Sequence, residues 1–268
     1  MTLASELYRG AAPYYVRYMI PYSEDIFQSL IRVCRLASSS RVLDLGAGTG
    51  MIGIRLARSV AHVLSVDPSD EMLREARRRA EVAGVKNIEF VVSRSEDLNE
   101  SMLSFDIATI ASSFLHMDRA TVLAKLTQIL KPDGCVAIIN RERDGSEPGE
   151  WRTAMLSDIK EFWGESYPAG PIVVRPAQSA SDREVLRASD FSEITEFRHY
   201  YEHHWSIDNL LGYLHSIYVG APGVLGARRD EFTGRIRRLL LSYSPSGFFS
   251  ERGHITTLLG YRPQISSR

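Results

Sequence analysis

Three glycines at alternate positions follow a short apolar run in the segment VLDLGAGTG, residues 42–50. Gly46, Gly48 and Gly50 tolerate positive φ and carry no Cβ, so the backbone there can turn sharply and approach a ligand at the start of the following helix. An acidic residue, Asp44, stands just before them. This combination predicts a loop that binds a nucleotide cofactor.

The glycine spacing differs from that of a dinucleotide loop. A dinucleotide fingerprint requires G-x-G-x-x-G, whereas Met51 occupies the position of its third glycine here. A second acid, Asp67, follows the next apolar run, where it can accept hydrogen bonds from both hydroxyls of an adenosine ribose. NAD enzymes have an acid at a similar position. Asp67 therefore indicates a nucleoside ligand but does not distinguish NAD from other nucleoside cofactors. Its alternative role is to cap the following helix.

Short β-rich runs alternate with helical patterns from Arg41 onward, which predicts a parallel sheet with crossover helices. The five expected strands are 42–45, 62–66, 88–92, 105–110 and 135–140, the last delivered by a turn at 132–134. The expected helices are 51–58, 69–83, capped by Ser69 or Asp70, and 121–130. Together they indicate a doubly wound α/β sheet.

The pattern changes beyond Asn140. Amphipathic helices are expected at 151–163, 208–218 and 229–241, a loop around 168–171, and further strands at 193–205 and 255–261. The predicted fold is a Rossmann-like, seven-stranded sheet with an inserted helical cap. Four parts are expected: an N-terminal helical lid at 1–40, the cofactor-binding core at 41–140, cap helices and a sixth strand at 141–252, and the last strand and tail at 253–268.

Five segments in order, VLDLGAGTG, VLSVDPSDEMLREAR, FVVSRSEDL, SFDIATIASSFLHM and LKPDGCVAIIN, resemble the successive motifs of class I S-adenosylmethionine-dependent methyltransferases. The resemblance spans roughly residues 40–140. It implies that Asp44 orients the methionine amino group, that Asp67 takes the ribose, and that Met72 lies against the adenine. Arg94 departs from the family pattern, because an aspartate is common at that position.

The resemblance also implies a set of residues that contact S-adenosylmethionine. They come from the loop, from the ends of the next three strands and from the tyrosine-rich N-terminal segment. The expected cofactor-binding residues are Asp44, Gly46, Ala47, Gly48, Asp67, Pro68, Met72, Ser95, Glu96, Ala111, Ser112 and Tyr18.

Four residues are candidates for catalysis. His116 follows the fourth strand, and a histidine there can take a proton from the acceptor, although a structural cap is the alternative. Tyr14 and Tyr15 lie in the N-terminal segment, where a tyrosine closes over the cofactor in small-molecule methyltransferases and where an aromatic face can favour a sulfonium. Asn140 ends the fifth strand, near the expected methionine end of the cofactor.

Composition narrows the partners. The chain has 32 Lys and Arg residues and 33 Asp and Glu residues, which gives a net charge of -1. Such a chain has no excess positive charge to attract a polyanion, so a nucleic-acid partner is disfavoured. The chain lacks an apolar run long enough to cross a membrane, and the expected compartment is the cytoplasm.

Cys34 and Cys135, far apart in the chain, are expected to be reduced core thiols, and no metal site is expected. A monomer or homodimer is expected.

The leading function is methyl transfer to an O, N or C nucleophile of a small metabolite. An alternative is a cyclase of the azetidine-2-carboxylate synthase type, in which the cofactor itself is the substrate and methylthioadenosine is released. Two further alternatives are a binding module that has lost activity and, disfavoured by the charge balance, an RNA methyltransferase.

Overall fold

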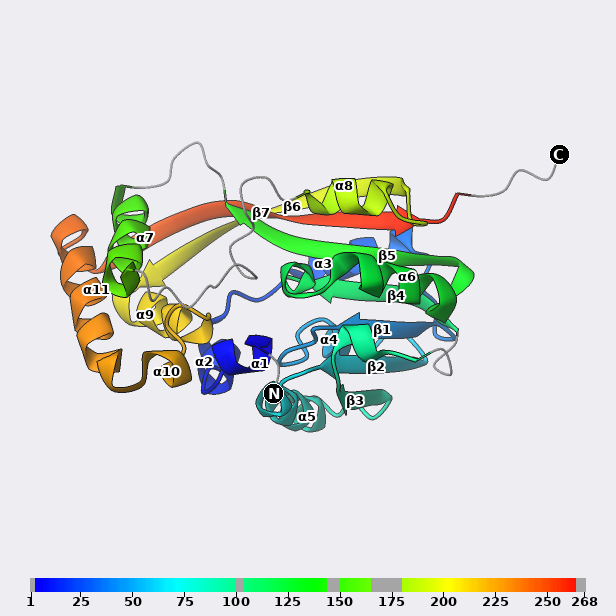
Figure 1. The fold of residues 1–268 in the computed structure, drawn as a ribbon, viewed down its shortest axis with the longest axis horizontal. Helices are drawn as coiled ribbons and strands as arrows, with labels where there is room; N and C mark the ends of the chain where they lie inside the picture. Colours follow the sequence, from blue (N-terminus) through cyan, green and yellow to red (C-terminus); the bar gives the residue numbers. More distant parts are fainter. Residues whose placement is uncertain (1–2, 100–103, 144–149, 165–179, 264–268) are drawn as a thin grey trace. The chain divides into compact units, whose positions relative to one another are not determined.

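The computed structural model describes residues 3–99, 104–143, 150–164 and 180–263. Its sheet has seven strands in the order β3-β2-β1-β4-β5-β7-β6 (Figure 1). The strands are β1 Arg41–Leu45, β2 His62–Asp67, β3 Ile88–Val92, β4 Phe105–Ala111, β5 Leu130–Arg143, β6 Glu193–Ser206 and β7 Phe248–Tyr261. This confirms the predicted α/β fold class and all seven predicted strands.

The first five strands run parallel. β1 lies between β2 and β4, and Asp44 stands beside Ser65 on one neighbour and Thr109 on the other. β3 extends the sheet from β2, and β5 extends it from β4. The carboxyl ends of β1, β2 and β4 therefore meet at one edge, which is where ligands bind in parallel α/β sheets.

Helices connect and flank these strands. They are α1 Leu3–Leu7, α2 Ala12–Tyr18, α3 Glu24–Val33, α4 Gly53–Leu56, α5 Asp70–Val82, α6 Arg119–Ile129, α7 Glu150–Trp163, α8 Asp182–Arg187, α9 Ile207–Ser216, α10 Pro222–Leu225 and α11 Arg229–Tyr243. Ser69 caps α5 as predicted, since its side-chain oxygen accepts the Met72 N–H at 3.3 Å. Such a cap stabilises a helix by about 1 kcal/mol.

The chain divides into two compact units. The sheet unit comprises Pro21–Arg141, Arg175–His199 and Ile255–Arg268, and the helical unit comprises Met1–Ile20, Glu142–Val174 and Tyr200–His254. The sheet unit has an apolar core that includes Leu43, Ile110 and Phe191. The helical unit has a separate core, in which Trp205 and Phe232 are almost fully buried and in which α7 packs on α11 and α2 on α9.

Two predicted boundaries were wrong near the sheet. The first helix was expected at 51–58, but α4 is only Gly53–Leu56, because the loop turn continues past Gly50, whose N–H donates to Ala47. The turn expected at 132–134 lies instead inside β5, which begins at Leu130. The β4–β5 register shifts there, as Pro132 has no N–H for the ladder.

The last strand begins earlier than predicted. It was expected at 255–261, whereas β7 starts at Phe248 and alternates between exposed and buried positions through Ile255. Glu251 occupies a buried position, and a charged residue there obscured the two-residue period. No separate helix was predicted at the positions of α8 and α10. The loop expected around 168–171 lies outside the described residues.

Candidate functional site

The glycine loop after β1 has the conformation that its sequence predicts. Gly46, Gly48 and Gly50 have φ of +62°, +53° and +76°. A Cβ at Gly46 would lie 2.4 Å from the Ser113 side chain, so that glycine permits close contact between the loop and the end of β4. Apart from its own chain neighbours, no described residue has an atom within 4 Å of a Cβ built at Gly48. The space over Gly48 is therefore open to a ligand.

Three amides of this loop donate within the protein. Ala47 N–H donates to the Val66 carbonyl at 3.1 Å, Gly48 N–H to Asp67 Oδ2 at 2.8 Å, and Gly50 N–H to the Ala47 carbonyl at 2.9 Å. A phosphate-binding loop directs such amides at the phosphate oxygens. With these three already engaged, the loop is poorly suited to hold a pyrophosphate.

Asp67 joins the loop to the start of α5. Its Oδ2 accepts the Gly48 N–H and its Oδ1 accepts the Ser69 N–H, both at 2.8 Å. The residue is 8% exposed, and burial raises the pKa of its carboxyl. Each carboxylate oxygen can accept a second hydrogen bond, so Asp67 can hold the loop and still receive two hydroxyls of a ligand.

Asp44 is buried beneath the loop. Thr109 donates its hydroxyl to Oδ1 at 2.7 Å, and Gly53 N–H donates to Oδ2 at 3.1 Å. Burial raises the pKa of Asp44 to about 7; these hydrogen bonds oppose the rise and the charge of Asp67 adds to it. Thr109 was not predicted as a site residue, although its register beside Asp44 follows from the predicted pairing of their strands.

The two carboxyls lack a cationic partner in the described part of the chain. The groups that shift their pKa values are hydroxyl or amide donors and, for Asp44, the other carboxyl. Two acids with raised pKa values repel an anion and are stabilised in their ionised form by a cation. This edge of the sheet therefore favours a cationic ligand over an anionic one.

The end of β4 forms the other side of the loop. Ser112 has φ of +53°, and its N–H donates to the Ile139 carbonyl at 2.8 Å. Its hydroxyl lies 3.4 Å from the Tyr22 hydroxyl. Ser113 donates to the Leu45 carbonyl at 3.1 Å, which ties this segment to the end of β1. Tyr22 was not selected from the sequence, yet it lies at this strand end, while Ala111 is the last residue of β4 as expected.

On the expected adenine side, Met72 on α5 and Ser95 are both 4% exposed. Glu96 accepts the Asp118 N–H at 2.8 Å and pairs with Arg94, whose Nε lies 3.3 Å from its Oε2. Arg94 thus stands at the position where the family often has an acid, and it binds the acid two residues later. Pro68 lies between Asp67 and the cap of α5.

His116 ends a 3₁₀ turn, Phe114–His116, just beyond Ser113. Its backbone N–H donates to the Ser113 carbonyl at 2.9 Å. Burial lowers the pKa of the imidazole to about 4. His116 is therefore neutral at physiological pH, with a ring nitrogen able to accept a hydrogen bond or proton.

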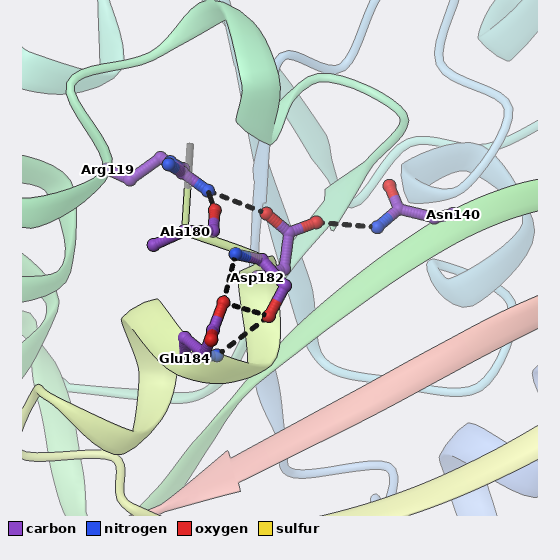
Figure 2. A network of polar contacts seen from close by, with 6 residues as sticks. Arg119, Asn140, Ala180, Asp182 and Glu184 are labelled. Carbon is purple, nitrogen blue, oxygen red and sulfur yellow. Dashed lines mark hydrogen bonds and ion pairs between the residues drawn. The ribbon is translucent and has the colours of Figure 1, made fainter. Parts of the chain in front are cut away.

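Asn140 is bound to another side chain (Figure 2). Its Nδ2 donates to Asp182 Oδ2 at 2.7 Å, and Arg119 Nη1 lies 3.2 Å from Asp182 Oδ1. Asp182 is the first residue of α8 and only 6% exposed. Asn140 was expected to end its strand, but β5 continues to Arg143, so Asn140 links the interior of β5 to the start of α8.

The candidate tyrosines Tyr14, Tyr15 and Tyr18 lie on α2, in the helical unit. Within that unit the Tyr14 ring lies 5.2 Å from the His215 ring, and Tyr18 packs against Gly212. In the sheet unit, contacts link the glycine loop to Asp67 and to the segment that contains Ser112 and Ser113. A contact between these tyrosines and the cofactor stays a prediction.

Residues 42–134 match the family described as "Methyltransferase domain". Residues 42–134 are a methyltransferase domain of the class I, S-adenosylmethionine-dependent type. The family resemblance drawn from the motifs is thereby confirmed.

Relatives of known sequence match part of this chain. It is 39% identical over 102 residues to a demethylmenaquinone methyltransferase of Clavibacter sepedonicus. It is 36% identical over 99 residues to a ubiquinone biosynthesis O-methyltransferase of Neisseria meningitidis. These matches cover 38% and 36% of this chain, and only 41% and 42% of the relatives' own lengths.

A solved structure is similar over more of the chain. The S-adenosylmethionine-dependent methyltransferase of Thiobacillus denitrificans, in complex with S-adenosylhomocysteine, covers 91% of this chain and is itself covered to 95%. The TM-score is 0.51 at 16% identity, which shows a shared fold. Within the described ranges, no helix is long and apolar enough to cross a membrane.

Proposed function

We propose that this chain binds S-adenosylmethionine at the edge formed by β1, β2 and β4 and transfers its methyl group to a nucleophilic atom of a small metabolite. The observation that carries the proposal is the pair of buried carboxyls, Asp44 and Asp67, on either side of a glycine loop in which three amides are already engaged. That arrangement suits a cationic nucleoside better than a phosphate. The methyltransferase domain match covers the same residues.

The described residues fit this cofactor. Asp67 would accept the ribose hydroxyls, Asp44 would stabilise the amino group, and the open space over Gly48 would admit the methionine chain. When bound, the cofactor supplies an activated methyl group on a sulfonium for in-line displacement. The protein then has to align the acceptor, exclude water and, where the acceptor is protonated, receive its proton.

The acceptor is the least constrained part of the proposal. One relative's name gives demethylmenaquinone as its substrate, and the other's gives transfer to oxygen in ubiquinone biosynthesis. Because both matches are confined to a partial segment, we extend only the small-molecule class to this chain. Quinols and phenols are the first acceptors to test, followed by amines and acidic carbon nucleophiles.

Product analysis tests the reaction. The purified chain is incubated with S-adenosylmethionine, with and without the acceptor panel, and S-adenosylhomocysteine and methylthioadenosine are quantified together. We expect S-adenosylhomocysteine that depends on an acceptor. Methylthioadenosine formed from the cofactor alone would instead support the cyclase and contradict the proposal.

Cofactor affinity should depend on pH through Asp44. The pKa of Asp44 without ligand is about 7, above its ordinary value of 3.8. Protonation of Asp44 therefore stabilises the unliganded fold. This contribution is fully present below pH 3.8 and is lost as pH rises through about 7. A cationic ligand favours the carboxylate and releases that proton. The Kd should therefore rise below pH 7, approaching about tenfold per pH unit.

Calorimetry at pH 6.5, in two buffers with different ionisation enthalpies, measures the released proton directly. The Asp44→Asn variant is the control, and its weaker binding should show no such pH dependence. A wild-type Kd that stays constant from pH 6 to pH 8 would mean that Asp44 does not face the cofactor's charge.

Asparagine substitutions at two glycines test where the ligand passes. Gly48 and Gly84 both have positive φ, and a Cβ at either position would lie more than 4 Å from every atom of the described ranges outside its own chain neighbours. Asparagine tolerates this backbone region, so Gly48→Asn and Gly84→Asn should have similar thermal stability. Only Gly48→Asn places a side chain in the proposed path, so its Kd for S-adenosylmethionine should rise about tenfold or more, equivalent to about 1.4 kcal/mol. Equal affinity in the two variants would place the ligand elsewhere.

His116 is proposed as the proton acceptor. His116→Gln keeps a polar side chain but removes the basic nitrogen, and it should lower kcat about 100-fold while leaving the Kd for the cofactor within about threefold. Because burial holds its pKa at about 4, the wild-type rate should show no inflection from His116 between pH 6 and pH 8. Stopped assays across this range measure both effects. An undiminished kcat would assign His116 a structural role.

A further inference from the structure

Two cysteines that are distant in sequence lie side by side in the sheet unit. Cys34 follows the last residue of α3, and Cys135 lies in β5, opposite Ile107 of β4. Their sulfur atoms are 3.5 Å apart across a separation of 101 residues. Both are free thiols, and the sequence predicted them only as separate core residues.

The two sulfurs are not equivalent. Cys34 is partly exposed, whereas Cys135 is 2% exposed. The Cys135 thiol donates to the Cys34 sulfur, and the Tyr261 side chain at the end of β7 interacts with both. The hydrogen bond from Cys135 lowers the pKa of Cys34, while the same contact and burial raise the pKa of Cys135. Cys34 is therefore the more accessible and more acidic thiol, and Cys135 is its buried neighbour.

We infer that Cys34 and Cys135 form an oxidation site, at which a hydroperoxide converts the dithiol into an intramolecular disulfide. The inference rests on the sulfur separation and on the difference in exposure. An S–S bond is about 2.05 Å long, so closure requires the sulfurs to approach by about 1.5 Å.

The reaction balances in two steps. The Cys34 thiolate attacks one oxygen of hydrogen peroxide, which breaks the O–O bond, gives a sulfenic acid and releases hydroxide, which takes up a proton to become water. The Cys135 sulfur then attacks the Cys34 sulfur, the S–S bond forms, and the sulfenic oxygen leaves as water with the Cys135 proton. Overall, two thiols are oxidised and one peroxide is reduced to two water molecules.

Thiol counting on the full chain tests this. The folded protein is treated with equimolar hydrogen peroxide, denatured, labelled with N-ethylmaleimide and examined by intact mass and peptide mapping. We expect the loss of both labels, a Cys34–Cys135 peptide pair in monomeric protein, and recovery of both labels after dithiothreitol. Because the fold holds the sulfurs together, oxidation in denaturant should be slower. Disulfides between chains, or faster oxidation in denaturant, would overturn the inference.

Single serine variants test the order of the two thiols. Cys135→Ser should stop at the Cys34 sulfenic acid, which dimedone traps. Cys34→Ser should leave Cys135 reduced, with a reaction at least about tenfold slower than that of Cys34 in the wild type. Equal rates at the two positions would contradict the assigned order. Thermal melting of each variant verifies that it is folded.

Discussion

Asp67→Asn is expected to raise the Kd for S-adenosylmethionine about 100-fold, equivalent to about 2.7 kcal/mol. The carboxylate accepts two backbone N–H groups, from Gly48 and Ser69, and an amide can accept at only one of its two terminal atoms. The substitution therefore loosens the loop and also removes one acceptor for the ribose. Hydrogen bonds to charged groups contribute about 1.5–3 kcal/mol each. The loss of these hydrogen bonds therefore accounts for most of the expected change in Kd.

The control for this variant is Asp70→Asn. Asp70 lies three residues later on α5, where it forms exposed ion pairs with Arg74 and Arg77. Exposed pairs contribute little, so its Kd should stay within about threefold of wild type. Calorimetric titration of both variants makes the comparison. Similar Kd values for Asp67→Asn and wild type would exclude Asp67 from the cofactor site.

Glu251→Gln is expected to destabilise the helical unit by about 3–5 kcal/mol, because it leaves two partly buried arginines without their buried anion. Glu251 accepts from Arg143 at 3.0 Å, Arg152 at 2.5 Å, Tyr201 at 3.0 Å and Trp205 at 3.3 Å. Its side chain is only 4% exposed. Hydrogen exchange should show lost protection in α7 and α11, with β1 and β2 of the sheet unit much less affected.

The stability difference should also depend on pH. Burial acts to raise the pKa of Glu251, but the charges of Arg143 and Arg152 outweigh it and hold the pKa below its usual 4.5. The ionised carboxylate therefore stabilises the fold above pH 4.5, and this contribution is lost as pH falls through the lowered folded value.

Glu202→Gln is the matched control for Glu251→Gln. Glu202 pairs with Arg252 at 3.4 Å but is 44% exposed, so its removal should change stability by less than about 0.5 kcal/mol. Urea unfolding followed by hydrogen exchange compares the two variants. Equal stability would show that the Glu251 network is not what holds this unit together.

The sequence predicted the elements that depend on local pattern. β3 was predicted to the residue, because a β-rich run there lies between polar flanks, and the Ser69 cap followed from its position before an amphipathic helix. The start of α8 also carries a local signal that was not used. Ser181 and Glu184 form a capping box, a pattern readable as S-x-x-E.

The remaining features depend on side chains brought together by the fold. In the sequence, the charge of Glu251 hides the alternation of β7, because a charged residue is not expected at a buried position. It can be buried there because arginines from a distant segment neutralise it. The pairing of Asn140 with Asp182 and the proximity of Cys34 to Cys135 join segments 42 and 101 residues apart. Periodicity reports which face of an element is buried, but it does not report which polar group lies opposite.

The most direct test of the central proposal is a parallel calorimetric titration of the wild-type chain with S-adenosylmethionine and with NAD at pH 7.5. Buried carboxyls at Asp44 and Asp67, together with loop amides already engaged, predict saturable binding of S-adenosylmethionine at one site per chain and no binding of NAD. Binding of NAD, or no heat from S-adenosylmethionine, would contradict the assignment of this edge of the sheet to a cationic nucleoside.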